Sequence, residues 1–183
     1  MRTIALLAAA ALAASVATAA TPDPKMVERG KYLVTIMLCN DCHTPHVLGP
    51  NGPEPDLTRM LSGHPESEAV APAPALGHGP WVWAGSGGMT AFSGPWGTSF
   101  TANLTPDAET GLGKWTYANF RDTIRTGKHM GRGRPVLPPM PIPMYKNFND
   151  ADLEAIFAYL QSIPAVKNRV PEPMAPAADV AMK

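Results

Sequence analysis

The sequence predicts an all-α fold built as a single domain, and two observations support this class. Three segments, at residues 25–38, 117–126 and 150–162, repeat apolar residues at helical spacing between start and stop signals. No segment alternates apolar and polar residues for long enough to form a sheet. The chain of 183 residues carries 15 basic and 15 acidic side chains, and this balance argues against a nucleic-acid partner.

The N-terminal segment has the pattern of a secretory signal peptide over residues 1–20. Arg2 precedes an apolar run over residues 4–16, and small residues follow at Ala17 and Ala19. The alternative is a membrane anchor, but a run of about 13 apolar residues is shorter than the roughly 20 that span a bilayer as a helix. We therefore expect removal of this segment, export to the bacterial periplasm and no membrane span in the mature chain.

The first predicted helix begins after Pro24 and ends at Cys39. Gly30 lies on the same side as its apolar residues, which are Val27, Leu33, Val34, Met37 and Leu38. We expect one domain over residues 25–164, interrupted by a long irregular insert at about 46–97. Pro, Gly and Ala dominate this insert among isolated aromatic residues, with no sustained period.

Two further helices follow the insert. The second has Thr116 as its N-cap and ends before Gly127. The third has Asn149 as its N-cap and stops before Pro164, with one apolar stripe formed by Leu153, Ile156, Phe157 and Leu160. Residues 165–183 form a Pro/Ala-rich tail, which we expect to be weakly ordered because it can bury little apolar area.

The motif Cys39-Asn40-Asp41-Cys42-His43 indicates covalent attachment of one haem c. Two thiols three positions apart can bond to both vinyl-derived carbons on one edge of a porphyrin, and the adjacent histidine can bind the iron. A redox-active disulfide is one alternative, but it gives His43 no role and lacks a surrounding βαβ pattern. A zinc site is another alternative, and it would need a distant fourth ligand from a chain with only 2 cysteines.

A second axial ligand is expected on the opposite face of the haem, where a methionine thioether would raise the reduction potential. Residues 138–144 supply two candidates, Met140 and Met144, among prolines that restrict the backbone. Met140 lies between two prolines and is favoured, with Met144 as the alternative. Weaker candidates lie elsewhere in the sequence: His64, His78, Met89, His129 and Met130.

The motif and several later segments together resemble class I c-type cytochromes. The resemblance is closest to the haem domains in cytochrome subunits of periplasmic alcohol and aldehyde dehydrogenases, and it covers roughly residues 26–45 and 98–164. The later segments are Asn103–Asp107, Thr110–Trp115, Ile124–Gly127, Met140–Pro141 and Asp152–Leu153.

This resemblance implies a set of contacts around the haem. The motif histidine and the methionine of the Met-Pro segment bind the iron in that family, which implies His43 and Met140 here. The family pattern also implies that the carbonyl of Pro50, in the pair Gly49-Pro50, accepts a hydrogen bond from the ligand imidazole. The resemblance further implies that Gly30 meets the last helix, at the stripe formed by Leu153, Phe157 and Leu160.

These features predict an exported mono-haem cytochrome that carries single electrons between periplasmic redox partners, such as a dehydrogenase or a terminal oxidase. Six-coordinate iron leaves no open position for a substrate, so an electron carrier is expected and not an enzyme. Two alternatives stay open: a haem c subunit of a periplasmic dehydrogenase complex, and a haem enzyme or sensor with a labile methionine ligand. A basic cluster could steer acidic partners or pair with haem propionates; it consists of Arg121, Arg125, Lys128, Arg132 and Arg134.

Overall fold

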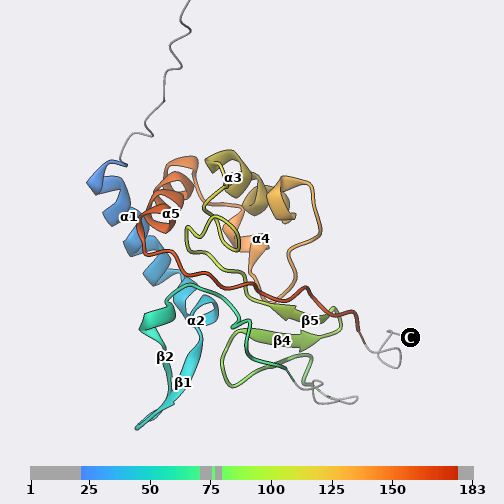
Figure 1. Ribbon diagram of the computed structural model, residues 1–183. Coiled ribbons are helices and arrows are strands. Elements are labelled where there is room, and N and C mark those ends of the chain that lie inside the picture. The colour runs from blue at the N-terminus through green and yellow to red at the C-terminus, as the bar shows by residue number, and fades with distance from the viewer. Residues whose placement is uncertain (1–21, 71–75, 77–79, 177–183) are drawn as a thin grey trace, which may run out of the picture.

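The computed structural model describes residues 22–70, 76 and 80–176 of the chain. Helices gather on one side of the molecule, and two small antiparallel sheets lie on the other (Figure 1). The prediction of an all-α fold is therefore wrong, because strands as well as helices build the described part. The predicted signal peptide lies outside the described residues. No helix among the described residues has the length and apolar character needed to cross a bilayer.

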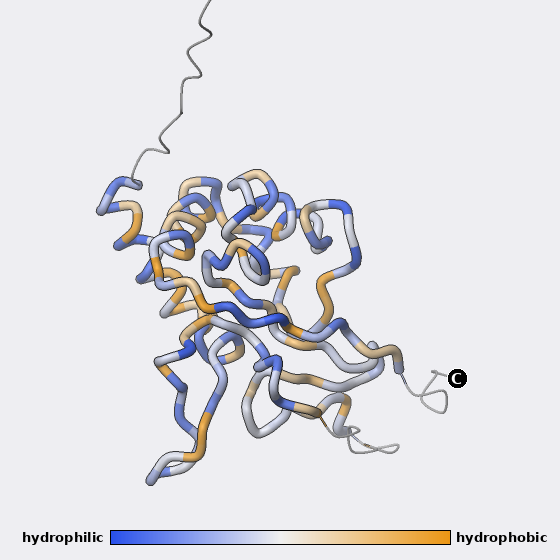
Figure 2. The backbone as a smooth tube through the Cα atoms, viewed as in Figure 1, coloured by the Kyte–Doolittle hydropathy of each residue, from blue (hydrophilic) through white to orange (hydrophobic). Residues whose placement is uncertain are grey.

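The helical side consists mainly of α1 (Pro24–Ile36), α3 (Tyr117–Thr126) and α5 (Asp150–Ser162). Figure 2 shows that each of them carries both hydrophobic and hydrophilic residues, as expected of helices that cover one core. The buried cluster beneath them consists of Leu33, Val34, Leu61, Leu112, Phe120, Ile124, Leu153, Ala155, Ile156, Tyr159 and Leu160. Residues from all three helices contribute to it, so this cluster fixes how the helices pack.

The close approach of α1 and α5 depends on Gly30. A Cβ atom at this position would lie 1.9 Å from the carbonyl oxygen of Ala155, so a larger residue would force the helices apart. The nearest atoms belong to Ala155 and Tyr159. The crossing therefore lies on a different face of α5 from the stripe of Leu153, Phe157 and Leu160 that the resemblance implied.

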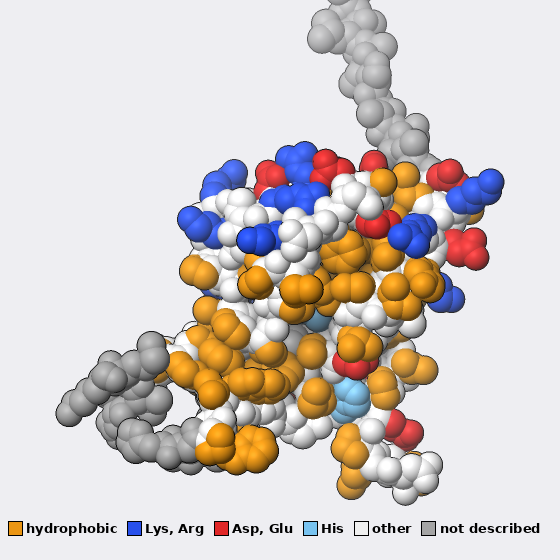
Figure 3. All heavy atoms as spheres, turned by 180° about the vertical axis from the view of Figure 1, so that it is seen from behind, with side chains coloured by type: hydrophobic (Ala, Val, Ile, Leu, Met, Phe, Trp, Pro, Cys, Tyr) orange, Lys and Arg blue, Asp and Glu red, His pale blue; other side chains and the backbone are white. Residues whose placement is uncertain are grey.

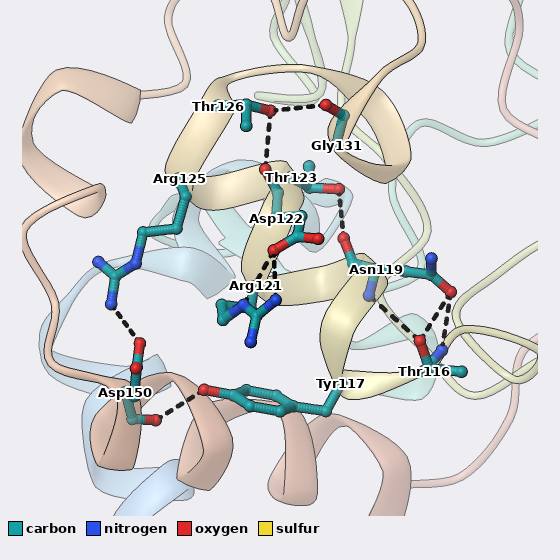
Figure 4. Close-up of polar contacts among 10 residues, drawn as sticks. All are labelled: Thr116, Tyr117, Asn119, Arg121, Asp122, Thr123, Arg125, Thr126, Gly131 and Asp150. Atoms are coloured by element: carbon teal, nitrogen blue, oxygen red, sulfur yellow. Dashed lines mark hydrogen bonds and ion pairs between the residues drawn. The ribbon is translucent and has the colours of Figure 1, made fainter.

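The second and third predicted helices are confirmed as α3 and α5, with their predicted caps. The Thr116 side chain accepts a hydrogen bond from the Asn119 backbone, and the Asn119 side chain accepts one from the Thr116 backbone, as Figure 4 shows. Gly127 ends α3 in the left-handed conformation, with φ 66°. Asn149 caps α5 through a hydrogen bond from the backbone of Asp152.

The region expected to be an irregular insert instead contains most of the strands. The strands β1 (His46–Gly49) and β2 (Gly52–Pro55) form a hairpin. A second sheet has the order β3-β4-β5, formed by Ala84–Gly85, Ala91–Gly94 and Gly97–Phe100. These strands are only two to four residues long, which is too short to give a period-2 pattern in the sequence.

The segment after α5 also differs from the expectation of a weakly ordered tail. Residues 165–176 run across the molecule from the helices to β5 (Figure 1). The Asn168 side chain donates to the carbonyl oxygens of Ser62 and His64 at 2.7 and 2.8 Å. Further along, Met174 exchanges two backbone hydrogen bonds with Thr98, both of 2.9 Å. Hydrogen bonds order this segment, and an estimate based only on apolar area does not count them.

Candidate haem site

The motif Cys39–His43 forms a helical turn of its own, α2. The first helix was predicted to continue to Cys39, but it ends at Ile36, and Leu38 then adopts a left-handed backbone with φ 60°. This break reorients the chain before the motif begins. Because Cys39 and Cys42 are three residues apart on one helical turn, their thiols share a face.

The His43 ring is held in one orientation by a hydrogen bond. The side chain is buried, and Nδ1 lies 2.8 Å from the carbonyl oxygen of Ala102. A carbonyl can only accept, so Nδ1 carries the proton and Nε2 keeps the lone pair that a metal requires. Burial lowers the pKa of His43, while the bond to Ala102 partly opposes this shift, so the ring is neutral near pH 7.

The acceptor of this hydrogen bond differs from the one that the resemblance implied. Pro50 lies in the turn between β1 and β2, next to Gly49, and the imidazole bonds to Ala102 instead. Ala102 lies two residues after Phe100, the last residue of β5, so the second sheet positions the acceptor. The predicted role of Pro50 is therefore wrong for this chain.

The two cysteines are free and partly buried. Burial raises the pKa of the Cys39 thiol to about 11 and also raises the pKa of Cys42. Redox-active Cys-x-x-Cys pairs need the opposite shift, because the thiolate is the attacking species. The environment of these thiols therefore argues against the alternative of a cycling disulfide.

The two candidate methionines differ in burial. Met140 is half-buried and packs against the core cluster, as Cys39 does. Met144 lies on α4 (Ile142–Tyr145) with 70% of its surface exposed. The segment before α4 is not simply extended, since it turns at residues 138–140 and contains a cis peptide bond between Pro138 and Pro139.

Three hydrogen bonds around the candidate site residues were not found from the sequence. The Tyr145 hydroxyl donates to the carbonyl of Met37 at 2.5 Å, and burial raises the pKa of this tyrosine to about 12, with the nearby Cys39 and Cys42 contributing. The others are the Ala102 carbonyl and the Ser99 hydroxyl, which donates to the carbonyl of Pro138 at 2.6 Å. Every residue has a carbonyl, so the identity of Ala102 gave no signal.

The donor set suits haem c better than a bare metal ion. Within the described residues, no group of three or more His, Cys, Asp or Glu side chains is arranged to hold a metal. A porphyrin supplies four nitrogen ligands itself, so iron in it needs only two more from the protein, such as an imidazole and a thioether. The neutral His43 imidazole could supply one of these two ligands, and the Cys39 and Cys42 thiols could bond to the porphyrin itself.

The basic cluster is partly neutralised by nearby carboxylates. Arg121 pairs with Asp122 at 2.8 Å and Arg125 with Asp150 at 2.6 Å (Figure 4). Arg134 lies 3.5 Å from Glu172. Figure 3 shows the basic side chains gathered over the helices, while the other half of that face is mostly hydrophobic or uncharged. These ion pairs weaken the case for a strongly basic docking surface.

The comparisons with known proteins identify the family of this chain. A family model described as cytochrome c matches residues 27–164, so the chain belongs to the cytochrome c family, whose members bind haem c covalently. It is similar to a subunit of the nicotinate dehydrogenase of Pseudomonas putida, with 41% identity over 88 residues, which are 48% of this chain and 7% of that protein.

Two further relatives are also named as subunits of dehydrogenases. The quinone-dependent alcohol dehydrogenase cytochrome c subunit of Gluconacetobacter polyoxogenes is 29% identical over 154 residues, which are 83% of this chain and 25% of that protein. The gluconate 2-dehydrogenase cytochrome c subunit of Pantoea cypripedii is 38% identical over 65 residues, covering 36% of this chain and 14% of that protein. The chain thus spans a quarter or less of the length of these relatives.

Proposed function

We propose that this protein is an exported, mono-haem c subunit of a periplasmic dehydrogenase complex, in which it transfers single electrons without catalysing bond chemistry. Cys39 and Cys42 would hold the haem as thioethers, and His43 and Met140 would bind the iron from its two faces. Residues 1–20 would direct export and then be removed.

The observation that carries this proposal is the state of His43. Its ring is buried and neutral, and the Ala102 carbonyl fixes the proton on Nδ1. The free Nε2 is therefore prepared as a ligand before any metal binds, and the hydrogen bond raises its basicity.

Haem would supply the reversible exchange of one electron between Fe(II) and Fe(III). The chain would contribute the surroundings. His43 and Met140 would be the two protein ligands of the iron, and no ligand position would then be open for a substrate. The core cluster beside Cys39 and Met140 excludes water, and a soft thioether ligand favours the ferrous state and a higher potential.

The proposed partner follows from the relatives, since each is named as a subunit of a dehydrogenase. A free carrier that diffuses between enzymes would need no permanent partner. The surface favours the role of a dehydrogenase subunit over that of a free carrier. Three of the basic residues that could steer a transient partner are paired with carboxylates.

Purification tests the proposal. A C-terminally tagged protein, produced in its own cells, should be isolated gently from the periplasm and analysed by mass spectrometry and size exclusion. We expect it to elute with a substrate-oxidising subunit, and addition of that enzyme's substrate should reduce the haem within the complex. If the protein elutes alone as a monomer and no dehydrogenase co-purifies with it, the protein is a free carrier.

A further inference from the structure

The segment that presents Met140 has few hydrogen bonds to the rest of the protein. We call residues 137–141 the strap. Its three prolines have no backbone N–H group, so they cannot donate. Among the described residues, one hydrogen bond joins the strap to a distant part of the chain, from the Ser99 hydroxyl to the carbonyl of Pro138 at 2.6 Å.

A single long-range hydrogen bond therefore holds the strap between Val136 and the start of α4. Before it, the Val136 N–H donates to the carbonyl of Gly127 at 2.8 Å. After it, the Ile142 N–H bonds locally to the carbonyl of Met140 at 2.9 Å, and α4 begins. The contact from Ser99 falls two residues before Met140, which is closer along the chain to Met140 than any other long-range hydrogen bond of the described residues.

Ser99 itself is rigidly placed. It lies on β5, is 8% exposed and pairs with Phe92 of β4. The neighbouring Thr98 exchanges two backbone hydrogen bonds with Met174, so the strand is fixed on its other edge as well. The Ser99 hydroxyl is 3.3 Å from the Phe92 carbonyl and 2.6 Å from that of Pro138, so its one proton goes to Pro138.

We propose that Ser99 is a positioning residue for the axial methionine: its hydroxyl holds Pro138, and thereby keeps the Met140 sulfur on the iron. This inference rests on the proposed ligation by Met140. We expect that a competing ligand that displaces the thioether moves the strap and breaks this hydrogen bond. Removing the hydroxyl therefore makes displacement easier without changing either axial ligand.

The test measures binding of imidazole to the ferric holoprotein by absorption spectroscopy. Ser99→Ala should bind imidazole about fivefold more tightly than the wild type, the equivalent of one ordinary hydrogen bond. Ser99→Cys, which keeps the side-chain size but offers only a weak donor, should shift the affinity in the same direction. The matched control is Ser93→Ala in β4, whose hydroxyl donates to Gly97 at 3.3 Å and does not touch the strap.

The outcomes separate the two proposals. If the wild-type ferric protein shows the Fe–S charge-transfer band and all the variants bind imidazole as the wild type does, the role of Ser99 is wrong. The same conclusion follows if Ser93→Ala shifts the affinity as much as Ser99→Ala, because the effect is then one of general stability. If the wild type lacks the band altogether, the ligation by Met140 has failed instead.

Discussion

The helical half and the strand-containing half of the molecule contribute differently to the candidate haem site. Helices α1, α3 and α5 supply most of the buried apolar cluster. Residues 46–102 instead supply hydrogen bonds at the site, through the Ala102 carbonyl to His43 and the Ser99 hydroxyl to Pro138. Apolar packing therefore holds the helices together, while polar groups from the less regular half orient the residues that would bind iron.

The largest expected effect comes from the helical half, at the crossing of α1 and α5. Gly30→Ala should lower the free energy of unfolding by about 3 kcal/mol, because its Cβ would overlap the Ala155 backbone. Urea denaturation of the holoprotein measures this change. Gly87→Ala is the control, since a Cβ there meets nothing within 4 Å. Similar losses in the two variants would contradict the close crossing.

The strand-containing half should respond most to the loss of a buried amide. Asn168→Ala removes donors to Ser62 and His64 and the acceptor for the Glu66 N–H, all within 2.8 Å. Because buried backbone groups would lose their partners, we expect unfolding to become easier by about 2 kcal/mol in the same denaturation assay.

The control for this variant is Asn147, which is exposed where Asn168 is buried. Asn147 bonds only to nearby carbonyls at the end of α4 and is exposed. Asn147→Ala should therefore change stability much less than Asn168→Ala. A small effect of Asn168→Ala would mean that the segment after α5 is not held by this network.

A smaller effect is expected from the N-cap of α3. Thr116→Ala removes one half of the capping box with Asn119 and should cost about 1 kcal/mol of stability. Thr35→Ala in α1 is the control, because that exposed hydroxyl bonds only to a carbonyl within its own helix. Thermal unfolding should show a lower midpoint for Thr116→Ala and little change for Thr35→Ala.

The smallest expected effect depends on pH. Hydrogen bonds from Thr58 and then Arg59 lower the pKa of Asp56 to about 2, so its ionised form stabilises the folded state. This contribution is complete above the unfolded pKa near 3.8 and is lost as the pH falls toward 2. The side chains are partly exposed, so we expect less than about 1 kcal/mol. Urea denaturation measured near pH 2 and above pH 3.8 checks this. The wild type should lose this stability at the lower pH, and Asp56→Asn should not.

Much of the helical half was predictable from the sequence. Thr116, Gly127 and Asn149 have the capping roles that their residue types indicate, and the two later helices have the predicted bounds. The end of α1 was predicted two to three residues too late, since nothing in the periodic pattern shows that Leu38 takes a left-handed backbone.

The strand-containing half was harder to predict for physical reasons. Its strands are short and contain Gly and Pro, which have low strand propensity, so the pattern did not reveal the hairpins although only two residues connect the paired strands. The motif from Cys39 to His43 was recognisable because the chain has only 2 cysteines, and a histidine directly follows the second. By contrast, the acceptor for His43 is a backbone carbonyl 59 residues away, and only the folded chain brings it to the ring.

The proposed iron ligands of one covalently attached haem are His43 and Met140. The most direct measurement is the Fe–S charge-transfer band of the ferric protein, recorded for the wild type, Met140→Ala and Met144→Ala. We predict that the wild type and Met144→Ala show the band and that Met140→Ala loses it. A band that survives in Met140→Ala, or disappears only in Met144→Ala, would contradict the claim.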